Sequence, residues 1–146
     1  MTGTLPGVPP AAFSWPVRIY WEDTDGGGVV YYANYLKFLE RARTEWLRAR
    51  GIGQRALKDQ SGGMFVVSAT EVRYMQPARL DDELLVTVRV ERFGAASLLL
   101  AQQVLAGPAA GGPVLCEGSI RIGWVQADTL RPARIPPSVL NVLEHP

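Results

Sequence analysis

Histidine and cysteine are almost absent from this sequence of 146 residues, which contains one of each. The single cysteine, Cys116, cannot form a disulfide within the chain or build a thiolate zinc site on its own. The single histidine, His145, is the penultimate residue, which excludes histidine-based triads and histidine metal clusters. We therefore expect no metal and no cofactor, and chemistry that depends on carboxylates, hydroxyls or backbone amides.

An excess of either charge is also missing. Fifteen Lys and Arg residues oppose fourteen Asp and Glu residues, for a net charge of +1, which argues against nucleic-acid binding by bulk electrostatics. Residues 1–16 are rich in proline and lack the basic residues of a signal peptide. Their apolar runs are far shorter than the ~20 residues that span a bilayer. We expect a cytoplasmic protein without a membrane span, in which residues 1–16 form a flexible tail.

Apolar periodicity predicts the first two elements of the domain. Residues 17–22 alternate apolar and polar side chains, which is typical of a half-buried strand. Residues 32–50 have the pattern of a long amphipathic helix, and Gly51 is suited to end it. The apolar stripe of this helix consists of Tyr35, Leu39, Ala42 and Trp46.

The remainder of the sequence is mostly predicted strand. The expected strands are residues 64–75, 83–93, 97–105 and 114–126. A short helical turn is expected at residues 56–60, and Ser138 can begin a terminal helix that continues through Glu144. One long helix with about five strands predicts an α+β domain over residues 17–137, in which the helix packs on an antiparallel sheet. Residues 138–146 then form a short C-terminal helix and tail.

The segment between the first strand and the long helix carries the chemistry. It places Asp25 at the end of a strand, before Gly26, Gly27 and Gly28 and the start of the helix. Glycines allow a substrate to approach the backbone closely, and the unpaired N–H groups of a helix N-terminus stabilise a developing oxyanion. A carboxylate beside such donors suits acyl transfer. The alternative is that Asp25 only forms a turn or caps the helix.

Six short runs carry a resemblance to a known family: residues 17–20, 22–25, 27–31, 33–35, 40–45 and 77–82. Through these runs the sequence resembles the hotdog-fold acyl-CoA thioesterases of the 4-hydroxybenzoyl-CoA thioesterase type. Within that family it is most similar to the Tol–Pal-associated branch. The similarity covers about residues 15–137, nearly the whole domain.

The resemblance implies a hotdog fold, with a five-stranded antiparallel sheet wrapped around one long helix. It also implies homodimers with joined sheets, tetramers made from two dimers, and active sites at the dimer interface that hydrolyse acyl-CoA. The family's catalytic aspartate corresponds to Asp25, and the amide that polarises the thioester carbonyl lies near Tyr32. Tol–Pal-associated members commonly have histidine at the position of Tyr32, so an imidazole-based role is lost here.

Further residues are expected to bind the substrate. Gly27, Gly28 and Val29 would lie against it, and Phe65 belongs to a strand that would line an apolar acyl pocket between subunits. Arg92 could meet a CoA phosphate, because a cationic fork suits that group. The alternative for Arg92 is a solvated strand end.

Two other functions remain open from the sequence. A hotdog hydratase or dehydratase would need a catalytic histidine, for which His145 is badly placed. A non-catalytic module of the same fold would bind acyl carrier protein or an envelope-complex partner without releasing a thiol. For the hydrolase, Asp25 could act as nucleophile or as general base. Aspartate is a weak base at neutral pH, which slightly favours nucleophilic attack.

Overall fold

Five strands and one long helix form the centre of the computed structural model, which describes residues 13–109 and 111–145. The elements in chain order are β1 (Phe13–Arg18), η1 (Trp21–Asp23), η2 (Tyr32–Asn34), α1 (Tyr35–Ala49), α2 (Gln54–Ser61), β2 (Gly63–Tyr74), β3 (Glu83–Phe93), β4 (Ser97–Ala106), β5 (Val114–Gln126) and α3 (Pro137–Glu144). The elements η1 and η2 are single 3₁₀ turns.

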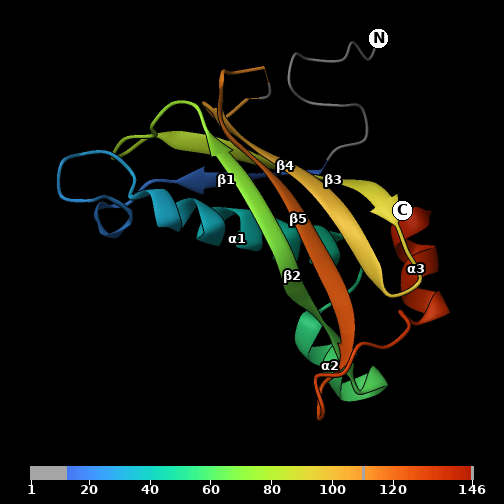
Figure 1. Cartoon of the computed structure of the whole chain (residues 1–146). Helices are drawn as coiled ribbons and strands as arrows, with labels where there is room; N and C mark the ends of the chain where they lie inside the picture. Colours follow the sequence, from blue (N-terminus) through green and yellow to red (C-terminus); the bar gives the residue numbers. More distant parts are fainter. Residues whose placement is uncertain (1–12, 110, 146) are drawn as a thin grey trace, which may run out of the picture.

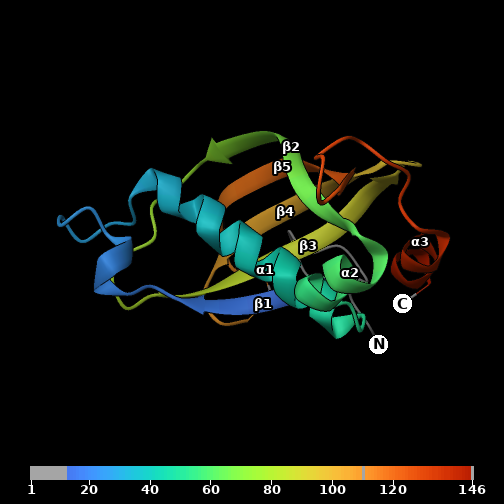
Figure 2. The same ribbon diagram turned by 90° about the horizontal axis from the view of Figure 1, so that it is seen from below.

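The sheet is antiparallel throughout, with the strand order β1-β3-β4-β5-β2. The first two strands of the chain are therefore the two edges of the sheet. The sheet curves around α1, which lies across its inner face, whereas α2 and α3 lie towards one end (Figures 1 and 2). The predicted α+β fold, with a five-stranded sheet around one long helix, is confirmed.

The core lies between α1 and the inner face of the sheet. The predicted apolar stripe of α1 is buried, together with Phe38. Alternate residues of the sheet face it, as the two-residue period of a strand requires. These are Leu84, Val86 and Val88 on β3, and Leu98, Leu100, Gln102 and Val104 on β4, all nearly or fully buried. Gln102 is the one polar residue in this series.

The start of the sheet corrects the sequence prediction. A strand was expected at residues 17–22, but β1 spans Phe13–Arg18 and pairs with β3 from Phe13↔Val88 onwards. Pro16 lies within β1, which is tolerated because β1 is an edge strand. Residues 13–16 of the predicted tail thus belong to the sheet, and residues 1–12 lie outside the described part of the chain.

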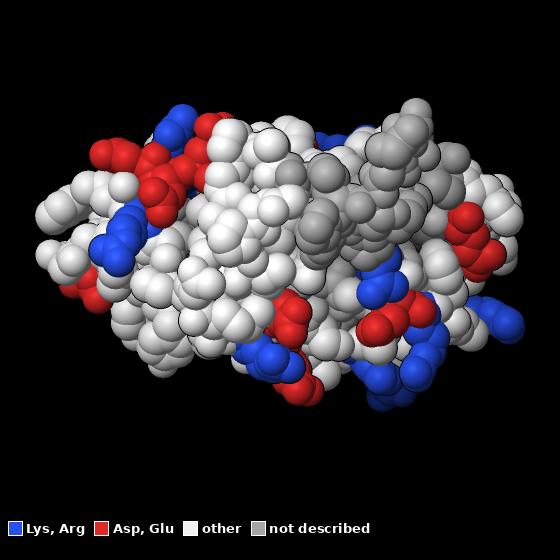
Figure 3. Space-filling view, turned by 90° about the horizontal axis from the view of Figure 1, so that it is seen from above, with Lys and Arg blue, Asp and Glu red and all other residues white. Residues whose placement is uncertain are grey.

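The outer face of the sheet, on the side away from α1, carries charges of both signs, mostly towards its rim (Figure 3). No patch of one sign dominates this view, as expected from the net charge of +1. Within residues 13–109 and 111–145, no helix is long and apolar enough to cross a membrane.

Candidate active site

The loop between η1 and η2 presents the predicted catalytic carboxylate. A β-bridge joins Thr24 to Val30, and the Asp25 N–H donates to the Val29 carbonyl at 3.0 Å. The Asp25 side chain is exposed, and its Oδ1 accepts the Gly27 N–H at 2.7 Å. The loop is thus a narrow hairpin, called the glycine loop below (residues 24–30), that holds the Asp25 carboxylate in one orientation.

The three glycines have different roles in this hairpin. Gly26 and Gly28 have φ angles of 87° and 91°, which side chains with a Cβ rarely adopt. The φ angle of Gly27 is ordinary, but a Cβ there would lie 3.1 Å from Asp25 Oδ1. Two glycines therefore form the turn, and the third leaves room for the carboxylate.

A second turn, residues 77–82, holds the glycine loop in place. The Val30 N–H donates to the Ala78 carbonyl at 2.9 Å, and the Leu80 N–H donates to the Gly28 carbonyl at 3.1 Å. These bonds fasten one limb of the loop to the segment between β2 and β3. They give a structural role to a run of residues on which the family resemblance partly depends.

The amide of Tyr32 follows this fastened limb, two residues after Val30. The Asp23 carbonyl accepts the Tyr31 N–H at 3.0 Å and Asn34 Nδ2 at 2.9 Å, which ties η1 to η2. Tyr32 is the first residue of η2, and α1 follows directly at Tyr35. Among the described residues no group accepts a hydrogen bond from the Tyr32 N–H. This donor at the start of a helix is available to an oxygen ligand.

The Tyr32 side chain packs against other aromatic rings. It is 61% exposed, and its ring centroid lies 6.0 Å from that of Tyr74, edge to face. The Tyr74 ring in turn lies 5.5 Å from Tyr35, whose hydroxyl oxygen accepts the Ala78 N–H at 2.9 Å. Sequence reasoning missed Tyr74 as a neighbour of the site, because the pairing of strands that brings it there is not encoded locally.

Two tyrosines near the start of α1 have a raised pKa. Burial raises the pKa of Tyr35, an effect that the hydrogen bond from Ala78 opposes and that nearby Cys116 and Asp82 reinforce. Burial also raises the pKa of Tyr74, with smaller contributions from Cys116, Tyr32 and Tyr35. Neither phenol is therefore a general base at neutral pH.

Phe65 and Arg92 lie far from Asp25 within one chain. Phe65 pairs with Trp124 near the start of β2, whereas the Asp25 end of the molecule adjoins Tyr74, the last residue of that strand. Nine residues of strand separate the two, or roughly 30 Å at about 3.3 Å per residue. Arg92 is exposed near the end of β3, beside a register shift. A single chain thus places Asp25, Gly27, Gly28 and Val29 in one hairpin, with Tyr32 directly after it, but Phe65 and Arg92 lie elsewhere.

A groove beside α1 is lined in part by Arg43, whose hydrogen-bond partner lies behind the groove; sequence reasoning missed both residues. Arg43 on α1 donates from Nη1 to Gln102 Oε1 at 3.0 Å, and Gln102 is 1% exposed. Phe65 lies in the wall of this groove. A signal for Gln102 was present in the sequence, because it occupies an inward position of an otherwise apolar alternation in residues 97–105.

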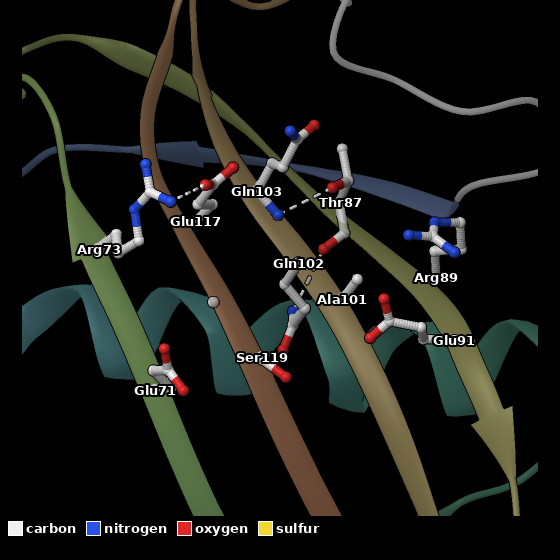
Figure 4. A pocket seen from close by; sticks show the side chains of 11 residues that line it. Glu71, Arg73, Thr87, Arg89, Glu91, Ala101, Gln102, Gln103, Glu117 and Ser119 are labelled. Carbon is white, nitrogen blue, oxygen red and sulfur yellow. Dashed lines mark hydrogen bonds and ion pairs between the residues drawn. The ribbon is translucent and has the colours of Figure 1, made fainter.

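Another hollow, of about 280 Å³, lies on the outer face of the sheet and contains none of the predicted site residues. Its floor includes Ala101 and Ser119, and the ion pair between Arg73 and Glu117 (3.6 Å) lies at its side (Figure 4). The sheet separates it from α1. It is therefore not part of the candidate site.

The single cysteine and the single histidine do not belong to the glycine loop. Cys116 is fully buried in β5, and burial, with a smaller effect of Glu117, raises its pKa to about 12. His145 is exposed directly after α3. In the described part of the chain, no three His, Cys, Asp or Glu side chains are grouped as for a metal ion.

Comparison with known proteins gives consistent matches along the chain. Residues 19–143 match the sequence model of the thioesterase-like superfamily. The chain is 37% identical over 133 residues to the acyl-CoA thioesterase YbgC of Haemophilus influenzae, which covers 91% of this chain and 95% of that protein. It is 40% identical over 128 residues to the acyl-CoA thioester hydrolase YbgC of Escherichia coli O6:H1, with coverages of 88% and 92%. The crystal structure of a probable thioesterase from Bartonella henselae, 33% identical, superposes with a TM-score of 0.77 over 86% of this chain and 100% of that one.

Proposed function

Because the chain belongs to the thioesterase-like superfamily, we propose that it hydrolyses acyl-CoA thioesters to a free acid and CoA, with Asp25 as the catalytic carboxylate. The observation that carries this proposal is that one fastened hairpin presents an exposed carboxylate, that of Asp25, and leads two residues later to the N–H of Tyr32, which has no acceptor among the described residues. Acyl transfer needs a nucleophile or base and a donor for the oxyanion.

The proposed reaction starts with the thioester carbonyl oxygen at the Tyr32 N–H. Either the Asp25 carboxylate attacks the carbonyl carbon, or it takes a proton from a water molecule that attacks. In both cases negative charge moves onto the carbonyl oxygen, where the amide stabilises it. Collapse of the tetrahedral intermediate breaks the carbon–sulfur bond and releases CoA as a thiolate. In the nucleophilic case, water then hydrolyses the mixed anhydride and regenerates Asp25.

The complete site is proposed to need two copies of the chain. β2 is an edge strand, and its residues 67–71 are exposed. Two β2 edges that pair antiparallel about a two-fold axis would form one continuous sheet. With the pairing centred near residues 68 and 69, Phe65 would lie opposite residue 72 of the partner. The glycine loop of each chain would then adjoin the Phe65 half of the other.

The remaining expectations follow from this dimer. Tetramers made from two such dimers, and a location in the cytoplasm, are carried over from the resemblance and the sequence. Arg92, on an exposed strand end, would contact a CoA phosphate. The same site would accept an acyl group carried by acyl carrier protein, because the reacting thioester is chemically the same.

A thiol-release assay over short, medium and aromatic acyl-CoA substrates tests the proposal. We expect hydrolysis by the natural protein and a loss of at least about 100-fold in kcat with Asp25→Asn. The variant keeps the size of the side chain and the acceptor for the Gly27 N–H. Asp128→Asn, at an exposed turn, is the matched control.

The non-catalytic alternative predicts a different result. A binding module would bind acyl carrier protein or acyl-CoA saturably and release no thiol with any substrate. Rates of thiol release by a folded Asp25→Asn protein that match those of the natural chain would refute the role of Asp25.

A further inference from the structure

The groove beside α1 runs along the side of the helix that faces β2. It has a volume of about 170 Å³. Its walls are mostly apolar, from Trp46 and Leu47 on α1, from Phe65, Val66 and Val67 on β2, and from Ile122 on β5. In the proposed dimer this part of β2 adjoins the partner subunit's glycine loop. The groove is therefore well placed to hold the acyl chain.

Arg43 places a cation in the wall of this groove. Among the described residues, its guanidinium makes a single hydrogen bond, to Gln102 Oε1 at 3.0 Å. Gln102 cannot turn away, because its Nε2 donates to the Leu39 carbonyl at 3.0 Å and to the Thr87 carbonyl at 3.3 Å. The bond therefore fixes the guanidinium, and its other N–H donors have no protein acceptor in the described part of the chain.

The charge of Arg43 is poorly compensated. No carboxylate lies within 4.0 Å of it among residues 13–109 and 111–145. Burial lowers its pKa, and only the more distant Glu40 opposes that effect. No Arg43 nitrogen is among the buried polar atoms without a partner in the described residues, so its unused donors face the open groove, where an acceptor can reach them.

Glu40 does not supply that acceptor. Its carboxylate accepts the Thr44 hydroxyl at 3.1 Å, and Thr44 Oγ1 accepts Gln54 Nε2 at 3.1 Å. Glu40 and Gln54 are exposed, so this chain of hydrogen bonds follows the rim of the groove. Arg43 thus keeps an open, forked set of donors next to apolar walls.

We propose that the groove binds acyl groups that end in a carboxylate, and that Arg43 pairs with that carboxylate. The proposal rests on the proposed thioesterase function and specifies its substrate class. The apolar walls suit the methylene groups of such a chain, and the guanidinium fork matches the two carboxylate oxygens. A volume of about 170 Å³ equals five or six water-sized groups at ~30 Å³ each. Acyl groups of four or five carbons, such as succinyl or glutaryl, fit this size.

The test compares two CoA thioesters of equal chain length, glutaryl-CoA and pentanoyl-CoA, with the natural protein and with Arg43→Met. We expect the natural protein to have the higher kcat/KM for glutaryl-CoA. Arg43→Met should lower the glutaryl-to-pentanoyl ratio of kcat/KM by about 10- to 100-fold, because a charge-assisted bidentate pair is lost. Most of the change should lie in KM for glutaryl-CoA, since the pair forms far from the reacting carbon.

Arg41→Met is the matched control, because Arg41 is exposed on another side of α1 and its guanidinium lies 5.9 Å from the centroid of the Phe38 ring. It should leave the substrate ratio as in the natural protein. Arg43→Gln is the second variant, since it can still hydrogen-bond Gln102 if Arg43→Met does not fold, and it should lower the ratio in the same way. A purely structural Arg43 would change the melting temperature and both substrates alike.

The outcomes separate the two proposals. Hydrolysis of both substrates without a preference for glutaryl-CoA, or with a ratio that neither Arg43 variant changes, overturns the role of Arg43 and leaves the thioesterase function intact. Absence of hydrolysis of every acyl-CoA by the natural protein overturns both.

Discussion

At the scale of single residues, the candidate site depends on where one carboxylate oxygen lies. Asp25 Oδ1 accepts the Gly27 N–H at 2.7 Å, and a Cβ at position 27 would lie 3.1 Å from the same oxygen. The backbone at Gly27 does not require glycine, so a change there acts on the carboxylate rather than on the turn. A substitution of Gly27 can therefore displace the Asp25 carboxylate without replacing Asp25.

We predict that Gly27→Ala lowers kcat for acyl-CoA hydrolysis by about 10-fold or more, because small displacements of a reacting group are costly. The melting temperature should change little. Steady-state kinetics with a good acyl-CoA substrate measure the effect. Gly53→Ala is the control, since nothing lies within 4 Å of a Cβ at Gly53. Equal activity of the two variants would contradict the prediction.

The raised pKa of Cys116 predicts that the free energy of unfolding falls at alkaline pH. Its folded-state pKa is about 12, against an ordinary value of 9.0. Because the unfolded thiol ionises first, its contribution to the free energy of unfolding is fully present below pH 9 and is lost as the pH rises from about 9 to about 12. Urea titrations between pH 8 and 10.5 should give a steeper loss for the natural protein than for Cys116→Ala. Parallel losses would refute the assignment.

At the scale of elements, the end of α1 is fixed by its backbone. Gly51 has a φ of 79°, and its N–H donates to the Arg48 carbonyl at 2.9 Å while the Ile52 N–H donates to the Leu47 carbonyl at 2.9 Å. This is a Schellman motif, and Leu47 and Ile52, the two positions of its usual apolar contact, are both buried. The predicted role of Gly51 in ending the helix is confirmed.

Gly51→Ala should therefore reduce the free energy of unfolding by about 1 to 2 kcal/mol, the cost of a left-handed conformation for a residue with a Cβ. Chemical denaturation measures it. Gly123→Ala serves as the comparison, because the φ of Gly123 is not left-handed and a Cβ there would meet only the Ala96 carbonyl oxygen, at 3.9 Å. A destabilisation of both variants by the same amount would count against the cap.

Strong local patterns predicted most elements. The strands at residues 83–93 and 114–126 were predicted with the bounds of β3 and β5, because turn-forming residues flank them. The predicted start of β1 was wrong, since proline-rich residues 1–16 were interpreted as a tail, and the edge position that tolerates Pro16 cannot be read from the sequence. Residues 21–23 turn because the Asp23 carboxylate accepts the Tyr20 N–H at 2.8 Å, a contact that alternation does not reveal.

At the scale of the whole molecule, the candidate site was predictable only where it is local. Asp25 and the Tyr32 amide are seven residues apart in the sequence, so one motif contains both. Arg43 and Gln102 come together only because α1 packs on β4, and no local pattern pairs them. Phe65 stays remote from Asp25 in one chain, so its predicted role depends on the association of two chains.

The free edge of β2 leads to a prediction about that association. Ala69→Lys places a charge on the exposed edge, and two such charges would face each other near the two-fold axis. We expect sedimentation velocity to detect a halving of the mass of the assembly, together with a loss of acyl-CoA hydrolysis. Ala56→Lys, exposed on α2, should keep both properties. An active Ala69→Lys protein with the mass of the natural assembly would refute the proposed interface.

The strand order also has a consequence for how the chain folds during synthesis. β2 pairs only with β5 within the described sheet, and the two strands are separated by all of β3 and β4. When the ribosome has just completed β2, the strand with which β2 pairs has not yet been made. The apolar side of α1 is also still uncovered at that point. The sheet cannot close until residue 126 has been added, so folding is dominated by long-range contacts and is expected to be slow. Until then the nascent chain exposes an unpaired edge, and this is the interval in which it most needs protection from aggregation.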